Sequence, residues 1–452
     1  MSIAYPISTT AKTRANKQPR RLLNFHSLLI LAALPLMFLS VVIPNSLQVP
    51  TAGMLLICFL LSLPQFKMTR GLRTVFGFYL CSVAVTVVYI AVGLTHGAPW
   101  SAVAQVLTIY IASPLLWIVV ASALCEVLGE ERLAGWFIWL AFLSCMSVAV
   151  YFVLYATGGA VAVSFFIKVG NVNLQKGYAA ATMHVYGSLI FLCGGFFSSP
   201  EVVRNKLVRV LLLSSLFVCA ITSGRSALIL SMPVGLLLGL LLTPRTAGYS
   251  RRILLPMKAL RVTVPTALAA VIAGYAIGKF SSIHLAVVFQ SFVDKLSAGG
   301  GSGRTGQAGA LFNGILDSNG FGVGHGIGVS YIRSFEYPWR YELVWLATIL
   351  RVGIVGACVY ASVFIFYIAR VVKEAAHRRL TVSSKFMFCG FIAAFVASNT
   401  NPYIEAFTFQ WMYIIPIVTF FIERSPHQTS APKPTTGWLI GNFPSQSKGS
   451  RV

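Results

Sequence analysis

Residues 341–368 read YELVWLATILRVGIVGACVYASVFIFYI, an apolar stretch in which Glu342 and Arg351 are the two charged residues. A helix needs about 20 apolar residues to cross the hydrocarbon core of a bilayer, where no water satisfies its backbone polar groups. This stretch is long enough, and similar stretches recur along the chain. It therefore predicts a membrane-spanning helix.

The composition of the whole chain agrees with this interpretation. Of 452 residues, 57% are hydrophobic and 10% are charged, and the mean hydropathy is +0.78. Soluble domains carry charge on roughly a quarter of their residues, so the composition excludes that class. The formal net charge of +24 would suggest nucleic-acid binding in a polar chain. Here the basic residues lie between apolar segments, so we expect no nucleic-acid partner.

Twelve apolar segments predict an all-α, polytopic integral membrane protein with about 12 transmembrane helices. Their approximate bounds are 22–43, 46–64, 74–94, 100–123, 134–156, 179–198, 207–223, 225–242, 260–279, 341–368, 384–399 and 406–422. The segment 46–64 gives the weakest signal, because it contains Pro50 and a short apolar run. The transmembrane domain is thus expected to cover 22–422.

The basic residues predict the orientation, because cytosolic loops retain Lys and Arg. With the N-terminus inside, 26 of the 35 basic residues fall on the cytosolic side, eight outside, and one, Arg351, within a span. This predicts a protein of the bacterial inner (cytoplasmic) membrane with both termini cytosolic. The tail 1–21 is basic, and the first helix is expected to be retained rather than cleaved as a signal peptide. The tail 423–452 is expected to be a disordered cytosolic extension.

Two long segments are expected on the outer face, at about 157–178 and 280–340. The second begins with an amphipathic run from Ile283 to Leu296. Long loops in compact proteins are usually functional or disordered, so chemistry is expected on this face.

The carboxylates expected outside give no metal-binding pattern. They are Asp294, Asp317, Glu336, Glu342 and Glu405. Neither these nor the eight cysteines show metal-ligand spacing, so we expect no metal and no cofactor.

Two arginines lie in sequences that suit an anion. Arg304 belongs to the Gly-rich stretch 299–306, whose backbone N–H groups can form an anion site, with a flexible hinge as the alternative. The stretch lacks the lysine and the glycine spacing of a nucleotide-binding P-loop. Arg225 lies in Ser223-Gly224-Arg225-Ser226, at the expected start of a helix whose dipole favours an anion. Snorkelling to lipid headgroups is the alternative for Arg225.

Glu342 is the strongest candidate for a catalytic group. At about 100° per residue it shares a helix stripe with Gly353 and Gly356, which favours close helix contact over lipid. A carboxylate near the membrane surface suits a general base that takes a proton from a hydroxyl. A structural ion pair with Arg340 is the alternative.

Arg351 lies on the side opposite Glu342. Either it is buried with a partner, or the span starts near residue 348 and Arg351 lies at the depth of the lipid phosphates. His325, His184 and Glu405 are weaker candidates for acid/base roles or glycan contacts, because a lone histidine is more often structural.

The second half of the chain resembles the superfamily of O-antigen ligases and Wzy-type polysaccharide polymerases. The resemblance lies in Ser-Gly-Arg-Ser at 223–226 and in Gly320-Phe321-Gly322-Val323-Gly324-His325-Gly326. A polar residue then enters a helix that continues as Gly353-Ile354-Val355-Gly356. The similarity covers about residues 200–420.

What the resemblance implies is a membrane-embedded glycosyltransferase of the C type. Such enzymes transfer glycans from an undecaprenyl-diphosphate carrier on the periplasmic side, without a metal or a nucleotide sugar. By this likeness Arg225 and Arg304 would hold the donor diphosphate, with help from Arg340 or Arg351. The loop 280–340 would close as a lid.

Glu342 stands where ligases of this superfamily carry a His-Asn pair. This departure favours a polymerase of a secreted, xanthan-type exopolysaccharide, with flippase, chain-length and export proteins as partners in the pathway. Two alternatives stay open: a ligase that attaches finished glycan, and a flippase or other transporter of lipid-linked oligosaccharide. Transporters often show internal repeats, and we find no two-half repeat in this sequence.

Overall fold

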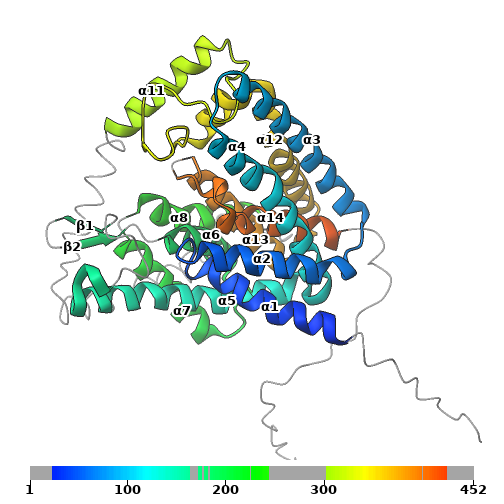
Figure 1. The fold of residues 1–452 in the computed structure, drawn as a ribbon. Helices are drawn as coiled ribbons and strands as arrows, with labels where there is room; N and C mark the ends of the chain where they lie inside the picture. Colours follow the sequence, from blue (N-terminus) through cyan, green and yellow to red (C-terminus); the bar gives the residue numbers. More distant parts are fainter. Residues whose placement is uncertain are drawn as a thin grey trace, which may run out of the picture.

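The computed structural model describes residues 23–162, 172–175, 178–181, 184–223, 225–243, 302–399 and 401–424. The predicted span at 260–279, the amphipathic run 283–296 and nearly all of both predicted tails lie outside these residues. The described part of the chain is mainly helical (Figure 1).

The α-helices in chain order are α1 (Leu23–Val41), α2 (Gln48–Ser62), α3 (Arg70–Thr95), α4 (Trp100–Val106), α5 (Ser113–Ala162), α6 (Val185–Ser198), α7 (Lys206–Thr222), α8 (Ser226–Leu241), α11 (Ser302–Asp317), α12 (Val344–Ala376), α13 (Val382–Ala397) and α14 (Trp411–Glu423). A π-helical turn, η2 (Leu107–Ala112), joins α4 to α5. Short 3₁₀ turns are η1 (Leu63–Gln65), η4 (Pro200–Val202), η5 (Tyr403–Glu405) and η6 (Phe407–Phe409). Strands β1 (Val172–Gln175) and β2 (Tyr178–Ala181) pair antiparallel, with Val172 opposite Ala181.

The predicted spans coincide with helices at most positions but are wrong at three ends. The segment 179–198 begins as strand β2, and its helix starts only at Val185. The segment 406–422 begins with η6, and α14 starts at Trp411. The segment 341–368 becomes α12, which starts at Val344 and ends at Ala376.

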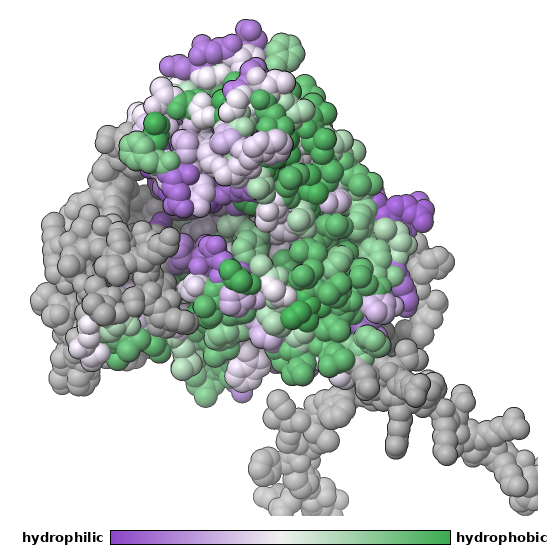
Figure 2. Space-filling view, viewed as in Figure 1, coloured by the Kyte–Doolittle hydropathy of each residue, from purple (hydrophilic) through white to green (hydrophobic). Residues whose placement is uncertain are grey.

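Among the residues that the structure describes, four helical stretches are long and apolar enough to cross a membrane: Gln48–Gln65, Arg70–Thr95, Trp100–Leu154 and Val344–Ala376. Five shorter apolar helices accompany them. Large apolar side chains on the outside of these helices are exposed, including Leu80, Val88, Trp139 and Val355. Figure 2 shows the broad hydrophobic surface that results. These are the properties of a membrane-embedded protein, because a water-soluble fold would bury such side chains.

The stretch Trp100–Leu154 is too long for a single crossing. Its 55 residues would extend over roughly 80 Å as one straight helix, against about 30 Å of hydrocarbon. Gly129 interrupts it with a φ of +72°, which lies outside the right-handed helical region. The interruption falls between the predicted spans 100–123 and 134–156.

The centre of the fold is formed by α6, α13 and α14. Every residue of α6 is buried, as expected for a helix that is apolar on all sides. The Phe191 ring on α6 meets Trp411 on α14 at 5.0 Å between centroids, and Phe196 meets Phe386 on α13 at 4.6 Å. Small residues bring α8 against α6, because a Cβ at Gly235 would lie 2.5 Å from the carbonyl oxygen of Gly194.

Helices α3 and α12 pack antiparallel at the edge of this core. The Phe78 and Phe366 rings lie 5.3 Å apart, and the hydroxyls of Thr86 and Tyr360 are 2.7 Å apart. Farther along α3, a Cβ at Gly93 would lie 2.1 Å from the carbonyl oxygen of His325. The loop before α12 therefore lies against the C-terminal end of α3.

Helix α12 is broken at Gly353, which has φ 67° and ψ 177°. Only glycine adopts this conformation readily. The loop 320–326 supplies the missing backbone partners: the N–H groups of Val323 and Gly324 donate to the carbonyls of Leu350 and Arg351 at 2.8 and 2.9 Å. The N–H of Ile354 donates to the carbonyl of Gly320 at 2.9 Å. The loop is thereby held at the break.

We expect Gly235→Ala to destabilise the protein by about 1–3 kcal/mol, because the added methyl group overpacks the contact with Gly194. Gly135→Ala is the matched control, since a Cβ there meets nothing within 4 Å. It should leave stability unchanged or raise it by up to about 1 kcal/mol through helix propensity. Thermal unfolding of the purified protein in detergent measures both. Equal melting temperatures for the two variants would contradict the close packing of α6 on α8.

Candidate functional site

The carboxylate of Glu342 is held between two arginines. Arg304 Nε lies 3.1 Å from one oxygen and Arg333 Nη2 lies 2.8 Å from the other. The three side chains are partly exposed, at 37%, 39% and 26% for Arg304, Arg333 and Glu342. Two cations and one anion thus form a solvent-accessible cluster, named here the Glu342 cluster.

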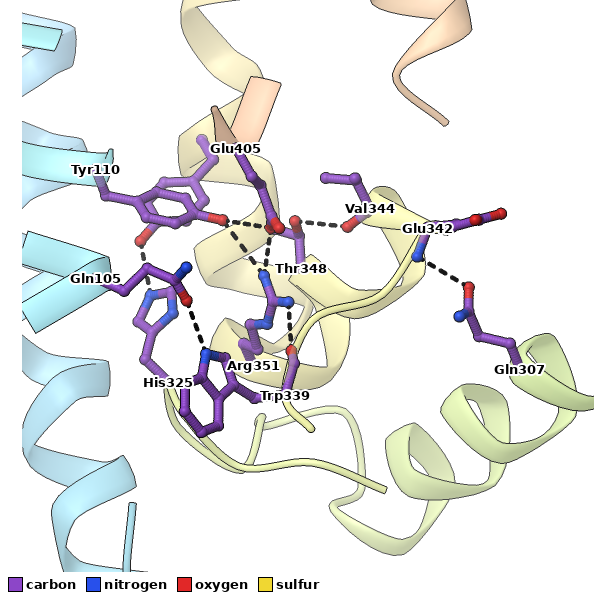
Figure 3. A network of polar contacts seen from close by, with 11 residues as sticks. Gln105, Tyr110, Gln307, His325, Trp339, Glu342, Val344, Thr348, Arg351 and Glu405 are labelled. Atoms are coloured by element: carbon purple, nitrogen blue, oxygen red, sulfur yellow. Dashed lines mark hydrogen bonds and ion pairs between the residues drawn. The ribbon is translucent and has the colours of Figure 1, made fainter. Parts of the chain in front are cut away.

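Gln307 positions the Glu342 cluster from α11. Its side-chain oxygen accepts from the backbone N–H groups of Glu342 and Leu343 at 3.1 and 3.0 Å (Figure 3). These N–H groups precede the first turn of α12, where no intrahelical acceptor exists. The Gln307 side chain is 2% exposed, so this contact is rigidly packed.

Two expectations about this region are wrong. The stretch 299–306 is not a hinge throughout, because α11 begins at Ser302 and Arg304 lies in its first turn. Glu342 does not share a helix stripe with Gly353, because it precedes α12. The proposed pair between Glu342 and Arg340 is replaced by the two arginines of the cluster, and the Arg340 guanidinium lies 5.5 Å from the ring centroid of Tyr337.

Arg225 lies immediately before α8, as predicted. Its backbone N–H donates to Ser223 Oγ at 3.0 Å, and its Nη1 donates to Asn401 Oδ1 at 3.2 Å. Asn401 is two residues from Tyr403 in η5. Burial raises the pKa of Tyr403, the Arg225 charge lowers it, and the Glu342 charge raises it. Tyr403 therefore lies within electrostatic reach of both charged groups, which places Arg225 and the Glu342 cluster on one side of the molecule.

His184 directly precedes α6 and is partly buried. One turn later, a Cβ at Gly187 would lie 2.7 Å from the ring of Tyr403. The start of α6 thus reaches the same region. Figure 2 shows hydrophilic surface on both sides of a hollow between α11 and the α6–α8 pair.

Arg351 and Glu405 form a buried ion pair beneath this surface. Both side chains are 5% exposed, and Arg351 Nη1 donates to Glu405 Oε1. Arg351 Nη2 also donates to the carbonyl oxygen of Trp339 at 2.8 Å, and Tyr110 from η2 donates to Glu405 at 2.8 Å. Of the two sequence alternatives, burial with a partner is therefore the one observed. The pair fixes the loop that leads into Glu342 and does not face solvent.

His325 is enclosed at the C-terminal end of α3, with 1% of its surface exposed. Its Nε2 lies 3.2 Å from the hydroxyl of Tyr360, and its backbone N–H donates to the carbonyl of Tyr89 at 2.9 Å. Burial and then the charge of Arg351 lower the pKa of His325 to about 3. The imidazole is therefore neutral near pH 7 and does not act as a cationic acid.

Four contributors to this region were missed from the sequence: Arg333, Gln307, Asn401 and Tyr403. Arg333 carried a usable signal, since it is one of the few basic residues on the outer side and lies nine positions before Glu342. The other three are uncharged and common in loops, so nothing in their pattern distinguishes them. Within the described residues, no three His, Cys, Asp or Glu side chains are grouped to hold a metal ion.

No family model, curated protein or solved structure matches the chain.

We expect Arg351→Met to destabilise the protein by about 3–5 kcal/mol, because it leaves the Glu405 carboxylate buried without its cation. The double variant Arg351→Met/Glu405→Leu should lose clearly less than the sum of the two single changes. Arg340→Met is the control, with an expected effect within about 1 kcal/mol for its cation–π contact. Unfolding in detergent measures the coupling; strictly additive losses would exclude a direct pair.

The lowered pKa of His325 predicts loss of stability in acid. Above pH 6.5 the imidazole is neutral in both the folded and the unfolded protein. As the pH falls from 6.5 toward about 3, the unfolded chain takes up the proton and the folded state does not, so stability decreases. At about pH 5 the loss is about 2 kcal/mol.

His325→Gln should remove this part of the acid destabilisation while keeping a polar group near Tyr360. His96→Gln is the control, because His96 is exposed and contacts the carbonyl of Val323 in the same loop. Melting temperatures at neutral pH and near pH 5 test the difference. An unchanged pH slope in His325→Gln would show that His325 titrates normally.

Proposed function

We propose that this protein is a glycosyltransferase that polymerises undecaprenyl-diphosphate-linked repeat units on the outer face of the bacterial inner membrane. The observation that carries the proposal is the Glu342 cluster. It combines a carboxylate with two arginines at a partly exposed site next to helices that can cross a membrane. Arginines bind diphosphate through paired hydrogen bonds and stabilise charge that develops on a leaving group.

The reaction assigns a role to each group of the cluster. A hydroxyl oxygen of the acceptor sugar attacks the anomeric carbon of the donor glycan, and the bond from that carbon to the diphosphate oxygen breaks. The hydroxyl proton passes to Glu342, which acts as general base. Undecaprenyl diphosphate leaves with the bonding electrons, and Arg304 and Arg333 neutralise the added charge.

Donor binding would also control whether Glu342 is available as a base. Both Glu342 oxygens accept from arginines, so the carboxylate is occupied. A diphosphate offers the same guanidinium groups a higher negative charge. Donor binding would draw Arg304 and Arg333 away and free Glu342 to accept a proton, so the base becomes active only when the donor is in place.

Arg225 and Asn401 are proposed to line the other side of this site. Arg225 is partly exposed and lies at the N-terminus of α8, where the helix dipole also favours an anion. Arg340 remains a proposed diphosphate contact near the entrance of α12. Arg351 and Glu405 are proposed to position the Trp339–Glu342 segment rather than to touch substrate, because they are buried.

A transporter of lipid-linked oligosaccharide is the second candidate, and one observation favours it. Broken helices and buried charges are typical of transporters, and this chain has both in Gly353 and the Arg351–Glu405 pair. A ligase would use the same arginines and differ in its acceptor.

We expect Glu342→Gln to lower polymer formation by about 100-fold or more while leaving the amount of protein in the membrane unchanged. The glutamine keeps the shape of the side chain but cannot take the proton. Glu336→Gln is the matched control, since this carboxylate lies on the same loop, is exposed, and is outside the cluster. Cells that depend on each variant are assayed for polymer and for lipid-linked units.

The same assay separates the candidate functions. A polymerase variant accumulates single repeat units on the carrier, open to membrane-impermeant reagents from outside. A transporter variant accumulates them on the cytosolic side, and a ligase variant accumulates finished polymer on the carrier. Normal polymer length in Glu342→Gln would remove Glu342 from the catalytic role.

A further inference from the structure

Helix α11 has two different exposed sides. Its buried stripe, which includes Gln307 and Leu311, packs against α12 and the following loop. On one flank of this stripe, Phe312 and Leu316 are 55% and 58% exposed. At about 100° per residue these two side chains lie about 40° apart, and the next residue in each case, Asn313 or Asp317, lies about 100° farther round the helix. The helix is therefore amphipathic, with an apolar flank that the described residues of the protein do not cover.

The break in α12 indicates where this flank lies relative to the hydrocarbon core of the membrane. The charged end of α12 begins at Arg370, and the 20 residues before it, which start at Leu350 beside the break, extend for roughly 30 Å, close to the hydrocarbon thickness. On α3 the distance along the axis from Arg73 to Gly93 is roughly 30 Å. Both estimates put the outer boundary of the hydrocarbon near Gly353 and Gly93, which the loop 320–326 joins.

The end of α11 is tied to this boundary by backbone hydrogen bonds. The N–H of Gly320 donates to the carbonyl of Ile315 at 2.9 Å, and the Gly320 carbonyl accepts from Ile354. Phe321, the next residue, is 77% exposed. In Figure 1, α11 lies at the upper left, beyond the upper end of α3 and crosswise to it, the orientation expected of a helix that runs along a membrane surface rather than through it.

The apolar flank lies close to exposed apolar side chains of α12. Ile354 and Val355 on α12 are 57% and 77% exposed, and the Ile354 side chain approaches Gly320, with a Cβ built there only 3.0 Å from its Cδ1. Phe321 and Leu316, on either side of Gly320 in the sequence, are also exposed. Because these apolar side chains begin on a helix that can cross a membrane, lipid is favoured as their occupant over a protein partner.

We propose that α11 is an interfacial helix whose flank of Phe312 and Leu316, together with Phe321, inserts into the outer leaflet. Interfacial helices of this kind bury their apolar side at the boundary between headgroups and acyl chains. Arg304, at the other end of α11, then lies at the level of lipid phosphates. A diphosphate attached to a lipid would arrive at that depth by lateral diffusion.

Nitroxide labels, one in each variant, test the proposal on the full-length protein in vesicles of phosphatidylcholine and phosphatidylglycerol. The exposed cysteines Cys81 and Cys358 are replaced by serine. Labels are then placed by Phe312→Cys and Leu316→Cys, with Asn313→Cys and Asp317→Cys as neighbours on the polar side. Collision rates with oxygen, which concentrates in lipid, and with a water-soluble nickel chelate are compared.

The expected result is a shift toward oxygen at 312 and 316 and toward the nickel chelate at 313 and 317. Equal exposure to the nickel chelate at all four positions would overturn the proposal, because the flank would then face water. Protection of 312 and 316 from both reagents would also overturn it, since a protein segment or a second copy would cover them. The measurement needs no substrate, so its outcome is independent of the proposed reaction.

Discussion

The backbone of α12 depends on hydrogen bonds from outside the helix. At Gly353 the chain leaves the helical region, so the carbonyls of Leu350 and Arg351 lose the donors four residues later. An unpaired carbonyl near lipid costs several kcal/mol. The N–H groups of Val323 and Gly324 donate to these two carbonyls, and the carbonyl of Gly320 accepts from the N–H of Ile354. Backbone hydrogen bonds thus hold the loop 320–326 in place. The positions of the residues that precede and follow the loop depend on these bonds.

The loop also explains why glycines alternate in it. A Cβ at Gly322 would lie 2.4 Å from the backbone N of Gly353, and one at Gly324 would lie 2.2 Å from that of Gly93. Three backbones therefore meet where no side chain fits, with positive φ at Gly322 and Gly324. His325 directly follows Gly324 and is enclosed by the same contacts, which is why this histidine is buried, neutral and structural.

Hydropathy alone located most helices, because the requirement for about 20 apolar residues leaves a strong signal. It could not show the break at Gly353, since glycine is common within transmembrane helices. Nor could it show that Ser302–Asp317 is helical. Four glycines reduce the helix propensity of this segment, and packing of Leu311 and Gly314 against α12 overrides it. The contact between Arg304 and Glu342 spans 38 positions and depends on that packing, so the sequence indicated both residues without joining them.

The energetics of the two ion-pair groups separate their roles. The Glu342 cluster is about one-third exposed, and such pairs contribute roughly 0–1 kcal/mol after solvent screening. A ligand with greater charge can therefore exchange with Glu342 at little cost. The Arg351–Glu405 pair is 5% exposed, and removing one partner from such a pair costs about 3–5 kcal/mol. Because of this cost, an anion at the surface does not displace Glu405 from Arg351. An anion at this surface is consequently expected to bind Arg304 and Arg333, while the buried pair keeps the segment Trp339–Glu342 in place.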